Sequence, residues 1–191
     1  MKTTKHNRAR ISVSASPFAF GLSAAFIGLS VVAAGCGISV EAEIPEVTIT
    51  QRGLSFDAVA DLGLGDVSVE RTFEQEHGKL DLPEGLDPEV KTLGITLRAA
   101  RGVADLSFIK LLRLTMDNGT GESIELGSYE QTAATADDKA ITVAALNPAN
   151  VFDAWSTDKA KFTLQVAGSL PSKSWALDVT IRFSARAKYE Y

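Results

Sequence analysis

His77 is the most versatile side chain for chemistry downstream of residue 35, and it lies in the acidic stretch Glu74-Gln75-Glu76-His77-Gly78. A histidine beside carboxylates can act as a general base or ligate a metal ion. A zinc site needs three or four ligands, however, and this part of the chain has no second histidine and no cysteine beyond Cys36. We therefore expect His77 to be a solvated loop residue, and we expect neither a metal ion nor a cofactor.

The sequence carries no established motif for catalysis. It has no Gly-x-Ser-x-Gly turn that would expose a nucleophilic serine, and no glycine-rich loop that would bind a phosphate. The acidic turns Asp61–Asp66 and Asp117–Glu122 lack the spacing of a calcium-binding loop. Two carboxylates that face each other across a cleft could still hydrolyse a glycan. We expect a protein that is not an enzyme, with carboxylate-dependent glycan hydrolysis as the alternative.

The first 35 residues have the composition of a secretory leader, which we expect to form a signal helix. A basic start is followed by an apolar run from Phe18 to Val32 and by three small residues. From Ile11 to Val40 the sequence contains no Asp, Glu, Lys, Arg or His. The basic residues of the start are Lys2, Lys5, Arg8 and Arg10.

The end of the leader, Val32-Ala33-Ala34-Gly35-Cys36, resembles the lipobox of bacterial lipoproteins. The resemblance implies that the thiol of Cys36 is lipidated, that the chain is cut after Gly35, and that the new amino terminus is acylated. The family prefers leucine where this sequence has Ala33. An uncleaved anchor helix and ordinary secretion with a free thiol are the alternatives. Because Cys36 is the only cysteine, the chain has no internal disulfide.

The charge of the chain bears on its partners and its location. The leader holds four of the 19 Lys and Arg residues and none of the 24 Asp and Glu residues, so the remaining chain has 15 basic and 24 acidic side chains and a formal charge of −9. Such an acidic domain is poorly suited to bind nucleic acid or anionic lipid headgroups, so we expect membrane contact through the lipid alone. In lipoproteins the residue after the cysteine influences sorting. Gly37 is not the aspartate associated with retention in the inner membrane, which favours the outer membrane and leaves either face open.

The sequence divides into three parts. Residues 1–35 are the predicted signal peptide, residues 36–46 a lipidated start with a short linker, and residues 47–191 one domain large enough to bury a core. A linker from Gly37 to Glu46 would reach at most about 30 Å, so we expect the domain to lie close to the membrane.

The C-terminal stretch has the clearest strand pattern. From Trp175 to Tyr191 the odd positions are apolar and the even positions are mainly polar, which places the two sets on opposite faces of a strand. We expect a bulge near Ser184–Ala185, because the strand is unusually long. Lys161–Ala167 alternates in the same way and is the expected pairing partner, joined through a turn at Gly168–Ser174. The end of this strand also resembles the last strand of outer-membrane β-barrels, but most strands here span about seven residues, below the roughly 9–11 that cross a bilayer.

Similar short alternating segments recur upstream between clusters of Gly, Asp, Asn and Pro. They predict an antiparallel β-sandwich of about eight or nine strands, immunoglobulin-like or jelly-roll-like, with one or two short helices. One helix is expected at Ala149–Trp155 with Asn147 as its cap and Pro148 in the first turn, and a single turn is expected at Asp105–Ile109. The apolar positions expected to face inward are Val47, Ile49, Leu54, Phe56, Ala58, Val67, Val69, Phe73, Leu93, Ile95, Leu97, Ala99, Leu112, Leu114, Met116, Ile124, Leu126, Ile141, Val143 and Ala145.

Together these features predict a lipid-anchored, non-enzymatic β-sandwich that binds a protein or a glycan at the bacterial cell envelope, with a purely structural or assembly role as a further alternative. Among the aromatic side chains, Tyr129 and Trp155 lie near connections, where binding groups tend to collect. The expected contact surface is the longest polar stretch, Glu74–Pro88. Its charged residues are Glu74, Glu76, His77, Lys79, Asp81 and Glu84.

Overall fold

The structure, a computed structural model, describes residues 28–34, 37–59, 65–77, 87–117, 121–132, 139–145 and 150–190. Most of the predicted signal helix lies outside these residues. So do the predicted cleavage residue Gly35 and lipidation residue Cys36, and Lys79, Asp81 and Glu84 of the expected binding loop.

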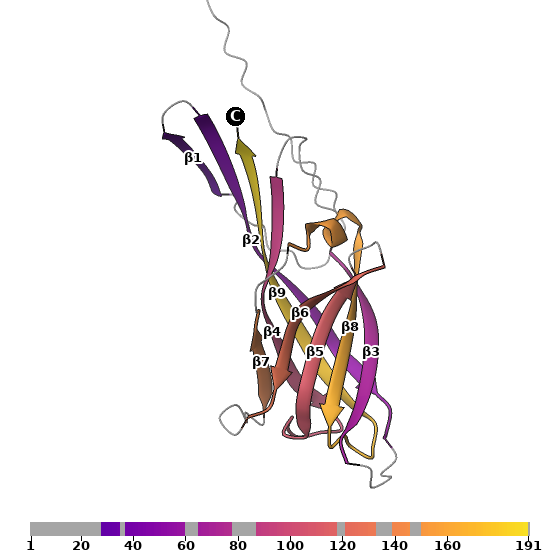
Figure 1. Ribbon diagram of the computed structural model, residues 1–191. Coiled ribbons are helices and arrows are strands. Elements are labelled where there is room, and N and C mark those ends of the chain that lie inside the picture. The colour runs from indigo at the N-terminus through magenta and orange to yellow at the C-terminus, as the bar shows by residue number, and fades with distance from the viewer. Residues whose placement is uncertain are drawn as a thin grey trace, which may run out of the picture.

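The chain is an all-β protein of two antiparallel sheets, as predicted (Figure 1). Sheet A has the strand order β1-β2-β9-β4-β7 and sheet B the order β3-β8-β5-β6. Without β1, which belongs to the predicted leader, each sheet has four strands. The strands are β1 (Gly28–Ala34), β2 (Gly37–Phe56), β3 (Val67–Glu76), β4 (Asp87–Arg101), β5 (Ile109–Asp117), β6 (Ser123–Glu130), β7 (Ala140–Ala144), β8 (Lys159–Gly168) and β9 (Trp175–Glu190).

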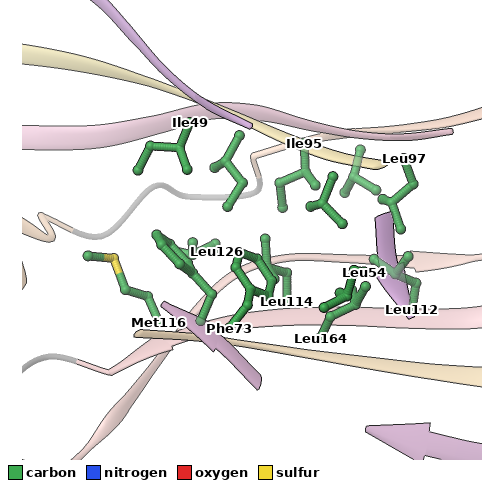
Figure 2. Packing of buried hydrophobic residues seen from close by; sticks show 14 of the residues in the cluster. Ile49, Leu54, Phe73, Ile95, Leu97, Leu112, Leu114, Met116, Leu126 and Leu164 are labelled. Carbon is green, nitrogen blue, oxygen red and sulfur yellow. The ribbon is translucent and has the colours of Figure 1, made fainter. Parts of the chain in front are cut away.

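The core lies between the two sheets and largely follows the predicted alternation (Figure 2). Ala58, predicted to face inward, is exposed. Ile49, Ile95 and Leu97 of sheet A face Phe73 and Leu114 of sheet B. Every odd position of β9 from 175 to 187 is buried. The buried side chains between the sheets are apolar apart from Thr92, so burial of apolar surface is the main force that holds the sheets together.

β9 and β8 were expected to pair with each other, and this prediction is wrong. β8 pairs with β3 and β5, whereas β9 pairs with β2 and β4 in the other sheet. The connection at 169–174 therefore crosses from one sheet to the other. Alternation shows only which face of a strand points to the core, and two strands that face each other across a core carry the same pattern as two neighbours in one sheet.

The bulge expected in β9 occurs instead in its two neighbours. Register shifts lie between Ile44 and Val47 of β2 and between Thr92 and Gly94 of β4, and all four positions lie opposite residues 182–185 of β9. The shift in β4 turns Leu93 outward, where 42% of the residue is exposed. The prediction that Leu93 faces the core is therefore wrong, because a bulge reverses the parity of the strand.

β2 contains a second shift, between Gln51 and Leu54, which changes its parity in the same way. Gly53 has a φ of 61°, a conformation that glycine adopts without strain, and its N–H donates to Asp178 Oδ1 at 2.8 Å. The shift lets Ile49 and Leu54 both face the core although one number is odd and the other even. The sequence pattern therefore suggested two strands where the structure has one.

The long strands of sheet A continue past the sandwich as a narrow arm, formed by β1, the start of β2, the end of β9 and the start of β4 (Figure 1). The stretch Gly37–Glu46, predicted as a linker, lies within β2, and it pairs with β9 from Ser39↔Glu190 onward. Ten residues of strand span about 30 Å. The sandwich is thus joined to residue 37 by paired strands instead of by a free linker.

One short helix closes the arm end of the sandwich. It is the 3₁₀ helix η1 (Phe152–Ser156), which begins later than predicted, while Asn147 and Pro148 lie outside the described residues. Trp155 of η1 is only 2% exposed and meets Phe183 edge to face at 5.2 Å. At the other end, 105–109 forms the expected turn, in which the Ile109 N–H donates to Leu106 O at 3.0 Å. Among the described residues no helix is long and apolar enough to span a membrane.

Candidate functional site

The residues predicted to bind a partner lie at the arm end of the sandwich. Glu74 and Glu76 are exposed residues near the end of β3, and His77 follows them directly. Glu76 pairs with Lys159 at 3.1 Å, and the strand register places Glu74 beside Lys161. Each carboxylate therefore has a neighbouring lysine, which limits the free negative charge of this surface.

His77 is half-buried, in contrast to the solvated loop residue that we expected. Its backbone N–H donates to Asp158 O at 3.1 Å, and its ring lies 4.3 Å from the ring of Trp155 at an interplanar angle of 33°. These contacts tie the end of β3 to η1. Among the described residues no group of three His, Cys, Asp or Glu side chains is close enough to hold a metal ion.

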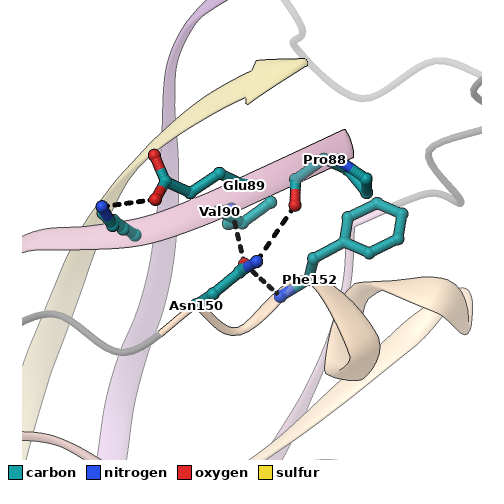
Figure 3. Close-up of polar contacts among 6 residues, drawn as sticks. Pro88, Glu89, Val90, Asn150 and Phe152 are labelled. Carbon is teal, nitrogen blue, oxygen red and sulfur yellow. Dashed lines mark hydrogen bonds and ion pairs between the residues drawn. The ribbon is translucent and has the colours of Figure 1, made fainter. Parts of the chain in front are cut away.

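Asn150 fixes η1 to the edge of sheet A (Figure 3). Its Oδ1 accepts from the N–H of Val90 at 2.9 Å and from the N–H of Phe152 at 3.1 Å, while its Nδ2 donates to Pro88 O at 3.0 Å. The Val151 N–H adds a bond to Val90 O at 2.8 Å. One amide side chain thus replaces the missing strand partner of β4 at this level. Asn147, which the sequence predicted as the cap of this helix, lies outside the described residues.

We expect Asn150→Ala to lower the free energy of unfolding by about 1–2 kcal/mol, because three hydrogen bonds are lost at a partly exposed site. Asn150→Asp is the matched control, since it keeps the acceptor for Val90 and Phe152 and loses only the donor to Pro88. It should recover about half of the loss. Urea denaturation at pH 7 measures both. Equal stability of Asn150→Ala and the wild type would show that η1 docks without this side chain.

The outer face of the arm carries charges of both signs. The register places Lys188 between Glu41 and Asp87, and Arg186 between Glu43 and Glu89. The pKa of Glu89 is lowered, first by its hydrogen bond with Lys91 and then by the charges of Lys91, Lys188 and Arg186. Glu89 forms an ion pair with Lys91, drawn as the dashed line at Glu89 in Figure 3. Opposite charges on neighbouring strands favour this pairing of β2, β9 and β4.

A shallow groove of about 660 Å³ lies at the opposite end of the molecule, on the outer face of sheet B. It crosses the first residues of β5, the last of β6 and β8, and the start of β3. Leu111 stands in the groove with 50% of its surface exposed, next to Ala167 in the register. Around this apolar strip lie Ser68, Arg113, Glu130 and Gln165.

Charge pairs and hydrogen bonds hold the rim of the groove in place. Arg113 Nε donates to Glu125 Oε2 at 2.6 Å, and Lys110 pairs with Asp66 at 2.8 Å. At the start of β5, the carboxylate of Asp105 accepts two hydrogen bonds from Ser107, and these bonds lower its pKa. Among the residues that line the groove, Arg113 is therefore held by Glu125, and Gln165 Nε2 donates to Ser68 Oγ at 3.3 Å, whereas Leu111 is left open to solvent.

The aromatic side chains are not available for stacking on a ligand in this groove. Trp155 and Trp175 are 2% and 1% exposed, so Trp155, although it lies near a connection, is not a binding group on the surface. Tyr129 lines the groove, but it pairs in register with the buried Leu112 and packs against the core. The surface combines one apolar strip with polar groups that can donate and accept hydrogen bonds.

Sequence reasoning missed the groove, although a signal was present. In Lys110-Leu111-Leu112-Arg113-Leu114 two leucines are adjacent, so one of them must face outward if Leu112 and Leu114 face the core. An apolar residue in the polar register of a strand is therefore the feature to look for. Its position on a shared surface with β3, β6 and β8 depends on strand order, which the pattern does not contain.

The sequence matches no protein-family model and no curated protein.

Proposed function

We propose that this protein is a lipid-anchored, non-enzymatic component of the bacterial cell envelope that binds a protein partner through the groove around Leu111. The observation that carries the proposal is the arrangement of the two ends. β2 begins at Gly37, directly after the predicted lipid site, at the end of the arm. The groove lies at the far end of the sandwich, where β5 begins and β8 ends.

The arm supports this function because it holds the sandwich away from the anchor. β2 has 20 residues, which correspond to about 60–65 Å of strand. A surface at its far end clears the lipid headgroups and faces other envelope components. The end with Glu74, Glu76 and His77 lies on the anchor side, and its charges already have lysine neighbours. The far groove is therefore the better candidate than the loop that the sequence suggested.

The chemistry of the groove favours a protein over a glycan. Glycan sites on β-sandwiches gain much of their affinity from exposed aromatic rings that stack on the sugar, and here both tryptophans are buried. A protein partner needs an apolar anchor surrounded by polar groups, which Leu111 and the rim residues provide. A partner side chain that covers Leu111 would bury apolar surface at both sides of the contact.

The rival function, hydrolysis by paired carboxylates, would have to use a different surface. Glu74 and Asp158 line a second depression of about 440 Å³ at the arm end, together with Lys159 and Lys161. Both carboxylates are exposed. A glycosidase holds its two carboxylates across a cleft that encloses the sugar, and these two lie on an open surface instead.

Site-specific photocrosslinking in cells tests the proposal. A crosslinker at position 111 should yield a product with one defined envelope protein, and Leu111→Glu in the purified protein should weaken binding of that protein at least about tenfold. Leu93 is the matched control, because it is a similarly exposed leucine on the other sheet and should give neither effect. Equal products from positions 111 and 93 would remove the groove from the proposal. If Leu111→Glu leaves binding intact, and deletion of the gene weakens the envelope, a structural role is favoured.

A further inference from the structure

The first half of β2 is paired on both of its edges. On one edge Ser39–Ile44 pairs with β9, and on the other edge Gly37–Glu43 pairs with β1 (Figure 1). The pairing with β1 runs through seven residue pairs, from Ala34↔Gly37 to Gly28↔Glu43, without a register shift. In this structure β1 is thus the edge strand of sheet A.

β1 consists of leader residues, so its presence depends on processing. If the chain is cut after Gly35, as the proposed function requires, Gly28–Ala34 leaves and β2 becomes the edge strand. The backbone N–H and C=O groups of Gly37–Glu43 that faced β1 then have no strand partner. An edge of this kind is a template for another extended chain, and natural proteins usually block it.

The sequence does not block this part of the edge. Gly37–Glu43 contains no proline, lysine or arginine, and β2 shows no register shift before Ile44. Its two charged residues, Glu41 and Glu43, lie opposite Lys188 and Arg186 of β9 in the register, so their charges have basic neighbours on the paired side. The protective features come directly afterwards. Pro45 lacks an N–H to donate, and the shift between Ile44 and Val47 interrupts the ladder. The open segment is therefore limited to about seven residues at the start of the mature chain.

We propose that, once the leader has been removed, the edge Gly37–Glu43 of β2 binds an antiparallel extended segment of a partner protein. This inference rests on the lipoprotein part of the proposed function and is independent of the groove. The occupant seen in the structure indicates the chemistry that fits. β1 has the sequence GLSVVAA, which is uncharged, small and rich in residues that favour strands.

A second copy of the chain does not fit the same edge in a membrane. Two β2 edges can pair antiparallel only about a two-fold axis, so the two arms would point in opposite directions. The lipid site of one copy would then lie about 20 Å along the strand from that of the other, and one sandwich would extend toward the bilayer. Both lipids could not reach the same membrane surface. An antiparallel pair of copies is therefore excluded, whereas a strand from a different protein is under no such constraint and is the occupant that we propose.

Hydrogen exchange on the processed protein, purified from membranes in detergent, tests this inference. The probe is a synthetic GLSVVAA peptide with lysines at both ends, and the control peptide has proline in place of the central valine. The first peptide should slow exchange of alternate amides in Gly37–Glu43 about tenfold, and the control should have no effect. The unprocessed chain, made by translation without membranes, should already be protected there. Its Val31→Pro variant should lose that protection, because Val31 pairs with Val40 at the centre of β1.

Each other outcome overturns the inference in a way that can be recognised. If the mass of the protein shows a lipid on Cys36 and the peptide has no effect, the edge is not a binding site and the lipoprotein assignment stands. Protection that rises with protein concentration in the absence of peptide would identify a second copy as the occupant. Retention of residues 1–35 in the membrane-derived protein would refute both the inference and the proposed processing. Slow exchange of the amides of Thr48–Gln51, which pair with β9, serves as the control that sheet A is folded in every sample.

Discussion

Trp175→Ala should lower the free energy of unfolding by about 3–5 kcal/mol, one of the largest effects expected for a single substitution in this chain. Trp175 is 1% exposed and lies at the start of β9. Its indole stacks on the ring of Phe56 at 4.2 Å and 11°, and Phe108 meets it edge to face at 5.0 Å. Removal of the indole leaves a cavity between β2, β9 and the 101–108 connection, which rigid strands fill poorly. Urea denaturation followed by circular dichroism measures the loss.

Two control variants separate packing from other causes. Trp175→Phe keeps a ring in the stack and should lose about 1–2 kcal/mol, because the indole N–H has no hydrogen-bond partner among the described residues. Leu111→Ala removes an exposed side chain and should stay within about 0.5 kcal/mol of the wild type. A loss below about 1 kcal/mol for Trp175→Ala would show that the far end of the core is loosely packed.

The fold class followed from the sequence because alternation is a local property. In β9 each residue reports its own face, and seven consecutive odd positions from Trp175 to Ala187 are buried as expected. The sequence pattern did not predict the parity changes at Gly53 and Leu93, because a bulge depends on the partner strand as well as on the bulged residue. They explain why one strand was counted as two and why an exposed leucine was placed in the core.

The alternation of apolar and polar residues does not determine the order of the strands. A connection of six residues, such as 169–174, suits both a hairpin within one sheet and a crossing between two sheets. The pairing of β9 with β2 joins residues more than 100 positions apart, for example Thr50 with Thr180. Such contacts depend on the packing of the whole core, and no short window of sequence contains them.

In the candidate site, too, features of a short segment could be predicted from the sequence, whereas contacts between distant segments could not. Charge and turn chemistry located Glu74, Glu76 and His77 on one surface, but the packing of His77 on Trp155 involves two segments far apart in the sequence. The groove combines four strands, so only the outward leucine, Leu111, could have been recognised in advance. The predicted lipidation signal is different in kind, because the resemblance of Val32–Cys36 to a lipobox lies in five consecutive residues and needs no fold to be recognised.

Cys36→Ala should transfer the protein from the membrane fraction to the soluble fraction almost completely. The three acyl chains expected of a lipoprotein would together bury enough CH₂ groups, at about 0.8 kcal/mol each, to make anchoring effectively permanent, and the variant would have no thiol to carry the first two. The acidic sandwich adds little affinity of its own for an anionic membrane surface. Fractionation of cells, followed by intact mass of the purified protein, measures both the location and the lipid.

The alternatives to a lipid anchor give different results in the same experiment. A signal-anchor helix would keep the Cys36→Ala variant in the membrane with residues 1–35 attached, because the apolar run from Phe18 to Val32 does not depend on the thiol. Ordinary secretion would leave both proteins in the soluble fraction and without a lipid. Only the lipoprotein predicts that the wild type is bound, that it carries acyl chains on residue 36, and that loss of one sulfur atom releases it. Release with the unfolding transition of the sandwich unchanged would show that Cys36 anchors the molecule and that the fold is stable without the anchor.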